Sequence, residues 1–144
     1  MKIIHGDYEL DDALARMDLG RCHQWLTDAY WSPGIERELV ERGFSSSALV
    51  VGTYHAGTQV GCLRLVSDRT RIAYLMDVFV AAEHRGKGLG RAMVRFALDH
   101  PDLSQVSVWM LATRDAHGVY ASLGFSAPEH PEYQMRLERP RRPS

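Results

Sequence analysis

The spacing of apolar residues near the N-terminus indicates helices. Leu19, Cys22 and Leu26 recur at intervals of three and four residues, which is the repeat of one face of a helix. Asp18 precedes them and is a favourable N-cap residue, so we predict a helix over residues 19–29. The same reasoning predicts three further features: a short strand within residues 8–17, a turn at residues 32–34 and a second short helix over residues 35–42.

Strand patterns fill the middle of the chain. Residues 47–54 (SALVVGTY) and 59–66 (QVGCLRLV) are rich in β-branched and aromatic residues, and the turn between them predicts a β-hairpin. Residues 72–80 (IAYLMDVFV) have the longest apolar strand pattern, so we expect this strand near the centre of a sheet.

The C-terminal half begins with an amphipathic pattern over residues 88–100. Leu89, Met93 and Phe96 form one apolar stripe, and Pro101 ends the pattern, which predicts a helix that covers a sheet. The remaining predicted elements are a strand over 106–112, a helix over 116–123 closed by Gly124, and a strand over 133–137. Strands that alternate with helices predict an α/β (α+β) fold in one domain, residues 1–144.

Composition and charge exclude several classes of protein. The 144 residues are 45% hydrophobic and 24% charged, as in a soluble globular domain, and the net charge is −1. A nearly neutral chain has no overall field that would attract nucleic acid or a membrane surface, so we expect neither partner. The charged tail at residues 136–142 reads as a solvated end. No apolar run approaches the length of about 18 residues that spans a bilayer, and no signal peptide is recognisable, so we expect a cytoplasmic protein.

The two cysteines, Cys22 and Cys62, form neither a CxxC pair nor a dense pattern. We therefore expect two free thiols in a reducing compartment, with no structural metal and no disulfide framework.

The most informative segment is the loop at residues 83–90, between the predicted strand and helix. Gly86, Gly88 and Gly90 stand at every second position, where glycine lets the backbone bend and lets a ligand approach closely. The first amides of a helix lack internal partners and carry partial positive charge, which favours a bound pyrophosphate. Full positive charge is added by Arg85, Lys87 and Arg91.

Two other phosphate motifs do not fit. A P-loop needs Ser or Thr after its lysine, but Gly88 follows Lys87. A dinucleotide fingerprint needs the spacing GxGxxG, whereas this loop has GxGxG. The alternative without a ligand is a tight strand-to-helix turn with basic residues for solubility.

Two motifs in this order give the chain a family resemblance. Residues 85–90 (RGKGLG) match the Arg/Gln-x-x-Gly-x-Gly/Ala signature of the GNAT superfamily of acetyl-CoA-dependent N-acyltransferases. Residues 116–125 (AHGVYASLGF) resemble the second motif of that family, a short helix that ends in Tyr-x-x-x-Gly-Phe. The chain departs from the family at Ala82, where many members have proline, and at residues 113–117, which lack a common asparagine.

The resemblance implies a mixed, mostly antiparallel sheet flanked by helices, with acyl-CoA held between a splayed central pair of strands. The gap would lie between the strands that end at Val80 and begin at Val106. Acetyl-CoA is the implied acyl donor, and no metal is implied. The implied contacts to the pantetheine arm come from Val78, Phe79 and Val80, and those around the pyrophosphate from Arg85, Gly86, Lys87, Gly88, Leu89, Gly90 and Arg91.

The implied reaction is direct attack of a primary amine on the thioester. The resemblance places a general acid at Tyr120, which would protonate the departing thiolate. Asp77 is the candidate base, because it lies in an apolar strand, where burial raises a carboxyl pKa. Pairing with an arginine is the equal alternative. Glu83, His84 and His117 are weaker candidates, since loop or surface positions explain them.

The loop between the first two predicted helices is the candidate acceptor wall. Asp28, Tyr30 and Trp31 combine an acid with aromatic rings, which suits an amine through charge and cation–π contact. A packed turn between helices is the alternative.

The acceptor would be a small-molecule or peptide amine, and a homodimer is an expectation from the family. Other functions stay open at this point: a longer acyl chain, a hydroxyl acceptor, or a non-catalytic acyl-CoA-binding sensor or assembly module.

Overall fold

The computed structural model describes residues 1–141 in two compact units, residues 1–113 and 114–141, and each is described by itself. The first unit contains one six-stranded sheet. Its strands are β1 (Lys2–His5), β2 (Tyr8–Asp11), β3 (Leu49–His55), β4 (Thr58–Ser67), β5 (Ile72–Val80) and β6 (Val108–Met110). Its helices are α1 (Leu19–Asp28), α2 (Arg37–Ser45) and α3 (Leu89–Leu98), with short 3-10 turns at Leu14–Arg16, Ala82–His84 and Pro101–Leu103.

The sheet is mixed, as predicted. Strands β1 to β5 pair with their neighbours in antiparallel fashion, and β5 pairs with β6 in parallel. The strand order follows the chain order, so β5 is the fifth strand rather than a central one. A parallel pair requires a crossover, and the segment that contains α3 supplies it.

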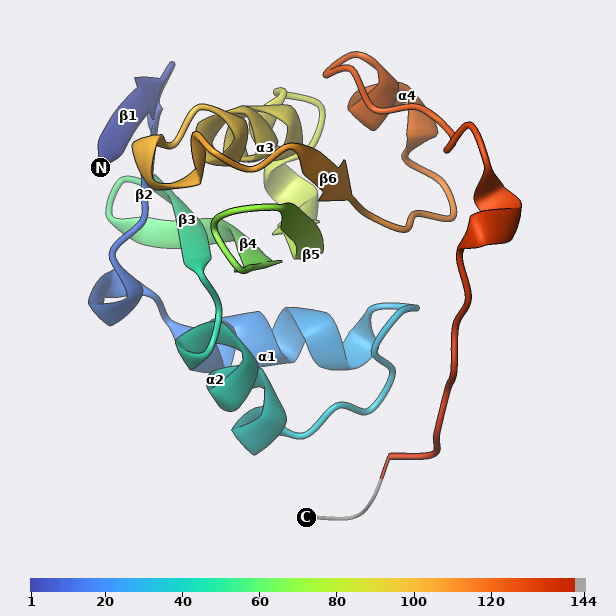
Figure 1. Cartoon of the computed structure of the whole chain (residues 1–144). Coiled ribbons are helices and arrows are strands. Elements are labelled where there is room, and N and C mark those ends of the chain that lie inside the picture. Colours follow the sequence, from blue (N-terminus) through green and yellow to red (C-terminus); the bar gives the residue numbers. More distant parts are fainter. Residues whose placement is uncertain (142–144) are drawn as a thin grey trace. The chain divides into compact units, whose positions relative to one another are not determined.

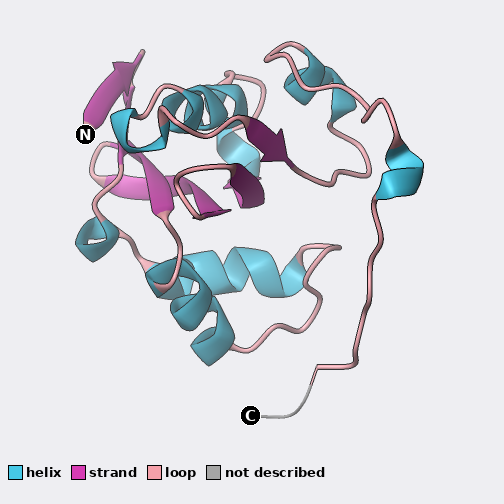
Figure 2. Cartoon of the chain, viewed as in Figure 1, coloured by secondary structure: helices cyan, strands magenta, loops and turns pink. Residues whose placement is uncertain are grey.

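Helices cover both faces of the sheet, with α3 on one side and α1 and α2 on the other (Figure 1; Figure 2). The α1–α2 side has an apolar cluster built from both helices, from β3 and β4, and from the residue that follows the first 3-10 turn: Met17, Cys22, Leu26, Val40, Phe44, Val50 and Cys62. On α3 the predicted stripe is buried, and Met93 and Phe96 are almost completely inaccessible. Burial of these stripes supplies most of the drive to form the helices.

Several element boundaries follow the sequence closely. The strand β5 has the predicted bounds, and α1 begins after Asp18, whose carboxylate accepts a hydrogen bond from the Arg21 N–H at 3.0 Å. Helix α2 begins two residues later than predicted and ends three residues later. The strand β6 is limited to three residues. Cys22 and Cys62 are both buried and free, and the hydrogen bond with Cys22, together with burial, raises the pKa of the Cys62 thiol.

One predicted strand is wrong. Pro131–Tyr133 forms a 3-10 turn, and residues 134–141 contain neither helix nor strand. A strand is expected from the sequence over residues 133–137, but Met135 in this segment is 98% exposed. A strand is stabilised by its neighbour in a ladder, and no strand of the described chain pairs with this segment. The described part of the charged tail is exposed as expected, and residue 142 lies outside the described residues.

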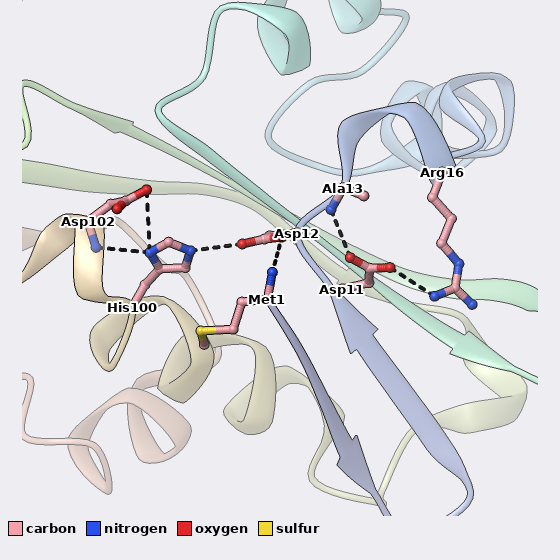
Figure 3. A network of polar contacts seen from close by, with 7 residues as sticks. All are labelled: Met1, Asp11, Asp12, Ala13, Arg16, His100 and Asp102. Carbon is pink, nitrogen blue, oxygen red and sulfur yellow. Dashed lines mark hydrogen bonds and ion pairs between the residues drawn. The ribbon is translucent and has the colours of Figure 1, made fainter.

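A polar network ties the start of the chain to the end of α3 (Figure 3). The carboxylate of Asp12 accepts hydrogen bonds from the Met1 ammonium group and from Nε2 of His100, both at 2.8 Å. Partial burial acts to raise the pKa of Asp12, but these hydrogen bonds prevail and lower it. The network fixes β1 against the crossover segment. None of the helices in residues 1–141 is long and apolar enough to cross a membrane.

Candidate active site

A bulge interrupts β5 just before its end. Arg64 of β4 lies opposite Met76, while Cys62 lies opposite Phe79, so β5 has one extra residue between these pairs. Asp77, within this stretch, has a left-handed backbone with φ of 55°, which is unusual for a residue other than glycine. The bulge therefore redirects the last residues of β5.

Beyond Tyr74, β5 and β6 are no longer paired. Their parallel ladder joins only Ile72–Tyr74 to Val108–Met110. Within the described chain, ladder partners on β4 are found for Leu75, Met76, Phe79 and Val80, and none of residues 75–80 has one on β6. The half-buried Val78, Phe79 and Val80 lie at this opening, where an extended ligand could bond to the free backbone edge.

The loop after β5 leads directly into the N-terminus of α3. Gly86 and Gly88 have φ of 77° and 75°, so two left-handed residues turn the chain into the helix. Among the residues that the structure describes, the backbone N–H groups of residues 86–90 donate to no other backbone or side-chain group. Such a row of unpaired donors at the positive end of a helix has the chemistry that suits an anion.

Basic side chains surround this row of donors in two different ways. Lys87 and Arg91 are exposed. Arg85 instead folds back, and its Nε donates to the Val80 carbonyl at 2.9 Å. Its guanidinium lies 5.3 Å from the centre of the Phe79 ring, and Trp25 of α1 stacks on that ring at 5.3 Å between centroids. Trp25 could not be predicted from the sequence, because this contact joins α1 to β5, which lie far apart in the chain.

Asp77 is held by two donors. Its Oδ2 accepts from Nε of Arg64 at 2.6 Å, and its Oδ1 accepts from the indole Nε1 of Trp31 at 2.9 Å. The Asp77 side chain is 11% exposed, so this ion pair is largely removed from water. This arrangement favours the arginine-paired reading that the sequence left open. Arg64 is a site residue that sequence reasoning missed, although an arginine in an apolar strand is a usable signal.

The predicted acceptor loop lies against Asp77 through Trp31. The rings of Tyr30 and Trp31 are perpendicular, with centroids 5.0 Å apart, and the side chains are 41% and 42% exposed. Asp28 is exposed at the end of α1. The structure thus brings two of these residues together with the bulge: Trp31 directly, and Tyr30 through Trp31.

Two further candidates flank the loop. Glu83 is exposed, whereas His84 is half-buried and its Nδ1 is hydrogen-bonded to the Tyr8 hydroxyl at 2.8 Å.

Tyr120 lies in the second unit, on α4 (His117–Ala121), which is shorter than the predicted helix. The Phe125 N–H donates to the Tyr120 carbonyl at 3.1 Å, and Gly124 takes φ of 101°, so the helix ends as predicted with a C′ glycine. The half-buried Tyr120 ring contacts Phe125 edge-on, with centroids 5.9 Å apart. His117 is exposed at the start of α4. A 3-10 turn, Pro131–Tyr133, completes the unit.

Comparison with known proteins identifies the family. The sequence profile of the acetyltransferase (GNAT) family matches residues 11–125. The chain belongs to the GNAT acetyltransferase family. This match contains the bulge, the splayed strands, the glycine loop and α4, so the features described above are those of a GNAT protein.

Solved structures agree with the family assignment. A proposed GNAT acetyltransferase from Xanthomonas campestris is 38% identical, with a TM-score of 0.88 over 92% of this chain and 94% of that one. A proposed acetyltransferase from Deinococcus radiodurans is 20% identical, with a TM-score of 0.72 over 95% and 92%. Glucosamine-6-phosphate N-acetyltransferase from Arabidopsis thaliana has the same fold at 14% identity, with a TM-score of 0.66 over 92% and 97%. No curated protein matched the sequence.

Proposed function

We propose that this GNAT protein is an N-acetyltransferase that transfers the acetyl group of acetyl-CoA to a primary amine of a small molecule or peptide. One observation carries the proposal: the opening beside β5 leads directly to the unpaired amides of residues 86–90. An extended arm with a pyrophosphate at its far end has the chemistry that this combination suits.

The residues present fit acetyl-CoA. The edge of β5 at Val78, Phe79 and Val80, which β6 does not cover, would bond to the amides of the pantetheine arm. At Val80 the carbonyl already accepts a hydrogen bond from Nε of Arg85. The amides of residues 86–90, with Lys87 and Arg91 nearby, would hold the pyrophosphate. Bound in this way, acetyl-CoA supplies the thioester whose carbonyl carbon the amine attacks.

The acceptor side rests on Tyr30 and Trp31. Two exposed rings beside the bulge offer an apolar and cation-attracting surface to an amine, and Asp28 adds negative charge on the same loop. An alkylamine has a pKa of about 10.4, so on the order of one molecule in a thousand is neutral at pH 7. Because both Asp77 oxygens accept hydrogen bonds, we infer that the amine loses its proton to water rather than to Asp77.

The reaction then exchanges one bond for another. The amine nitrogen forms a bond to the acetyl carbon, the carbon–sulfur bond breaks, and the thiolate of CoA receives a proton. We propose Tyr120 as the donor, on the strength of its position in the second family motif. A phenol with a pKa of about 10 is protonated at neutral pH, and this pKa is close enough to the thiol pKa of about 8.5 for the thiolate to accept the proton.

Release of free thiol from acetyl-CoA, measured across a panel of amines, tests the proposal. We expect thiol release that depends on the amine, with mass spectrometry showing one added acetyl group on the acceptor. A panel that includes hydroxyl acceptors and longer acyl-CoA donors separates the related transferases. Tight CoA binding by calorimetry without turnover of any acceptor would contradict the enzyme and support an acyl-CoA-binding module.

A further inference from the structure

The hairpin of β1 and β2 contacts the glycine loop at two points. His5 and Tyr8 lie directly opposite each other at the closed end of this hairpin. The ring Nε2 of His5 donates a hydrogen bond to the Lys87 carbonyl, at 3.2 Å. The hydroxyl of Tyr8 is hydrogen-bonded to Nδ1 of His84, at 2.8 Å. The hairpin therefore holds the loop both at its start and just before α3.

The His5 contact sets the direction of one amide. In a trans peptide the C=O and the following N–H point in opposite directions. Because the Lys87 carbonyl points toward His5, the N–H of Gly88 in the same peptide unit points away from the hairpin. Gly88 has no side chain and a left-handed backbone, so rotation of this peptide meets little local resistance. A bond to the carbonyl also polarises the peptide and strengthens its N–H as a donor.

The hydrogen bond between Tyr8 and His84 lies within a cluster of three rings, those of Tyr8, His55 and His84. Tyr8 is 7% exposed, and its ring lies 5.1 Å from that of His55 and 5.6 Å from that of His84, measured between centroids. The rings of His55 and His84 are 5.2 Å apart. Three packed rings restrict His84 far more than a single exposed hydrogen bond would. The start of the loop is therefore held by packing as well as by the phenol.

We propose that His5 and Tyr8 are positioning residues for the donor: they hold the glycine loop so that its amides face the pyrophosphate of acetyl-CoA before it binds. This inference rests on the proposed function, since it assigns the hairpin to the same pyrophosphate site. Neither residue touches the reacting atoms. Their effect is preorganisation, because the ligand then does not have to order the loop.

Calorimetry with CoA on paired variants provides the test. His5→Leu removes the donor, and we expect about five-fold weaker CoA binding, the equivalent of one ordinary hydrogen bond. His5→Gln offers an amide N–H to the same carbonyl and should bind CoA within about two-fold of wild type. Tyr8→Phe removes only the hydroxyl and should also weaken binding by a few-fold. Glu9→Gln is the matched control, because Glu9 lies on the same hairpin and pairs with Arg16.

A second donor separates positioning from general damage. S-acetylpantetheine lacks the pyrophosphate, so turnover with it should be the same in His5→Leu and wild type, while KM for acetyl-CoA rises and kcat stays unchanged. An equal loss with both donors would overturn the inference, as would His5→Leu and Tyr8→Phe proteins that bind CoA like wild type. A wild-type protein that does not bind CoA would instead overturn the proposed function, and the inference with it.

Discussion

Replacing Gly88 with aspartate should weaken CoA binding without weakening the fold. Gly88 is the residue before α3 and has φ of 75°. Asparagine and aspartate both tolerate this left-handed conformation better than other residues with side chains, and they have nearly the same shape. Gly88→Asn therefore has the same backbone strain as Gly88→Asp. The difference in CoA affinity between the two variants then reports the effect of one negative charge.

The size of this difference follows from the charges. The pyrophosphate of CoA carries two negative charges. At a separation of about 6 Å, two unit charges repel by about 0.7 kcal/mol in water and about 2.8 kcal/mol at an effective dielectric constant of about 20. Two phosphate charges therefore oppose the aspartate by at least about 1.4 kcal/mol, which is about ten-fold in the dissociation constant.

Stability should move the other way, because a carboxylate near a helix N-terminus is favourable by about 0.3–1 kcal/mol. We expect Gly88→Asp to melt at the same temperature as Gly88→Asn or higher, while calorimetry shows CoA binding weaker by ten-fold or more. The gap in affinity should shrink as salt is added, since the site is exposed. Equal CoA affinity of the two folded variants would refute the placement of the pyrophosphate at this helix.

Three further predictions concern other parts of the molecule. Trp31→Phe keeps a ring but removes the donor to Asp77, and Trp31→Ala removes both. The acceptor KM should therefore rise from wild type to Trp31→Phe and again to Trp31→Ala, with acetyl-CoA affinity unchanged. A parallel loss of melting temperature and of both affinities would indicate that the loop is a structural turn only. Tyr120→Phe should lower kcat by about 100-fold or more with little change in CoA binding; a kcat within a few-fold of wild type, with chemistry rate-limiting, would exclude Tyr120 as the acid. Asp12 has a folded-state pKa below its unfolded value, so it stabilises the protein above about pH 4, and that contribution is lost as pH falls through the folded pKa. In urea unfolding, Asp12→Asn should be less stable than wild type at pH 7, and its stability should depend less on acid. Identical profiles of unfolding free energy against pH for the two proteins would contradict the network.

The elements that the sequence predicted well are those with strong local signals. The cap at Asp18 marks the start of α1, and the long apolar pattern of β5, interrupted only by Asp77, predicts both ends of the strand. The strand β1 has only four residues and no marked pattern, so its formation depends on pairing with β2, which no local window contains. The reverse holds for residues 133–137, where alternation is present but no strand pairs with them in the described chain.

In the candidate site, too, the features with local sequence signals were predictable and those formed by long-range contacts were not. The glycine loop is contiguous in sequence, and its spacing and charges were enough to predict an anion site. The bulge at Asp77 depends on how β4 and β5 register, and a carboxylate in an apolar strand indicated only that something unusual occurs there. The Arg64–Asp77–Trp31 contacts and the support of the loop by His5 and Tyr8 join residues from separate elements. Such long-range contacts follow from the packing of the sheet and its helices, which a single sequence does not display.

The early end of the β5–β6 ladder also bears on how the protein behaves in solution. Residues 75–80 present a row of N–H and C=O groups without a β6 partner in the described chain. Rows of this kind act as templates for strands of other molecules and are a common origin of self-association. A pantetheine arm along this edge would occupy the position of the missing strand. Bound acetyl-CoA would then cover the exposed strand edge as well as supply the acetyl group. We expect protein freed of CoA to aggregate at lower concentration than protein kept with excess CoA, and the ligand to raise its melting temperature in proportion to the logarithm of its concentration.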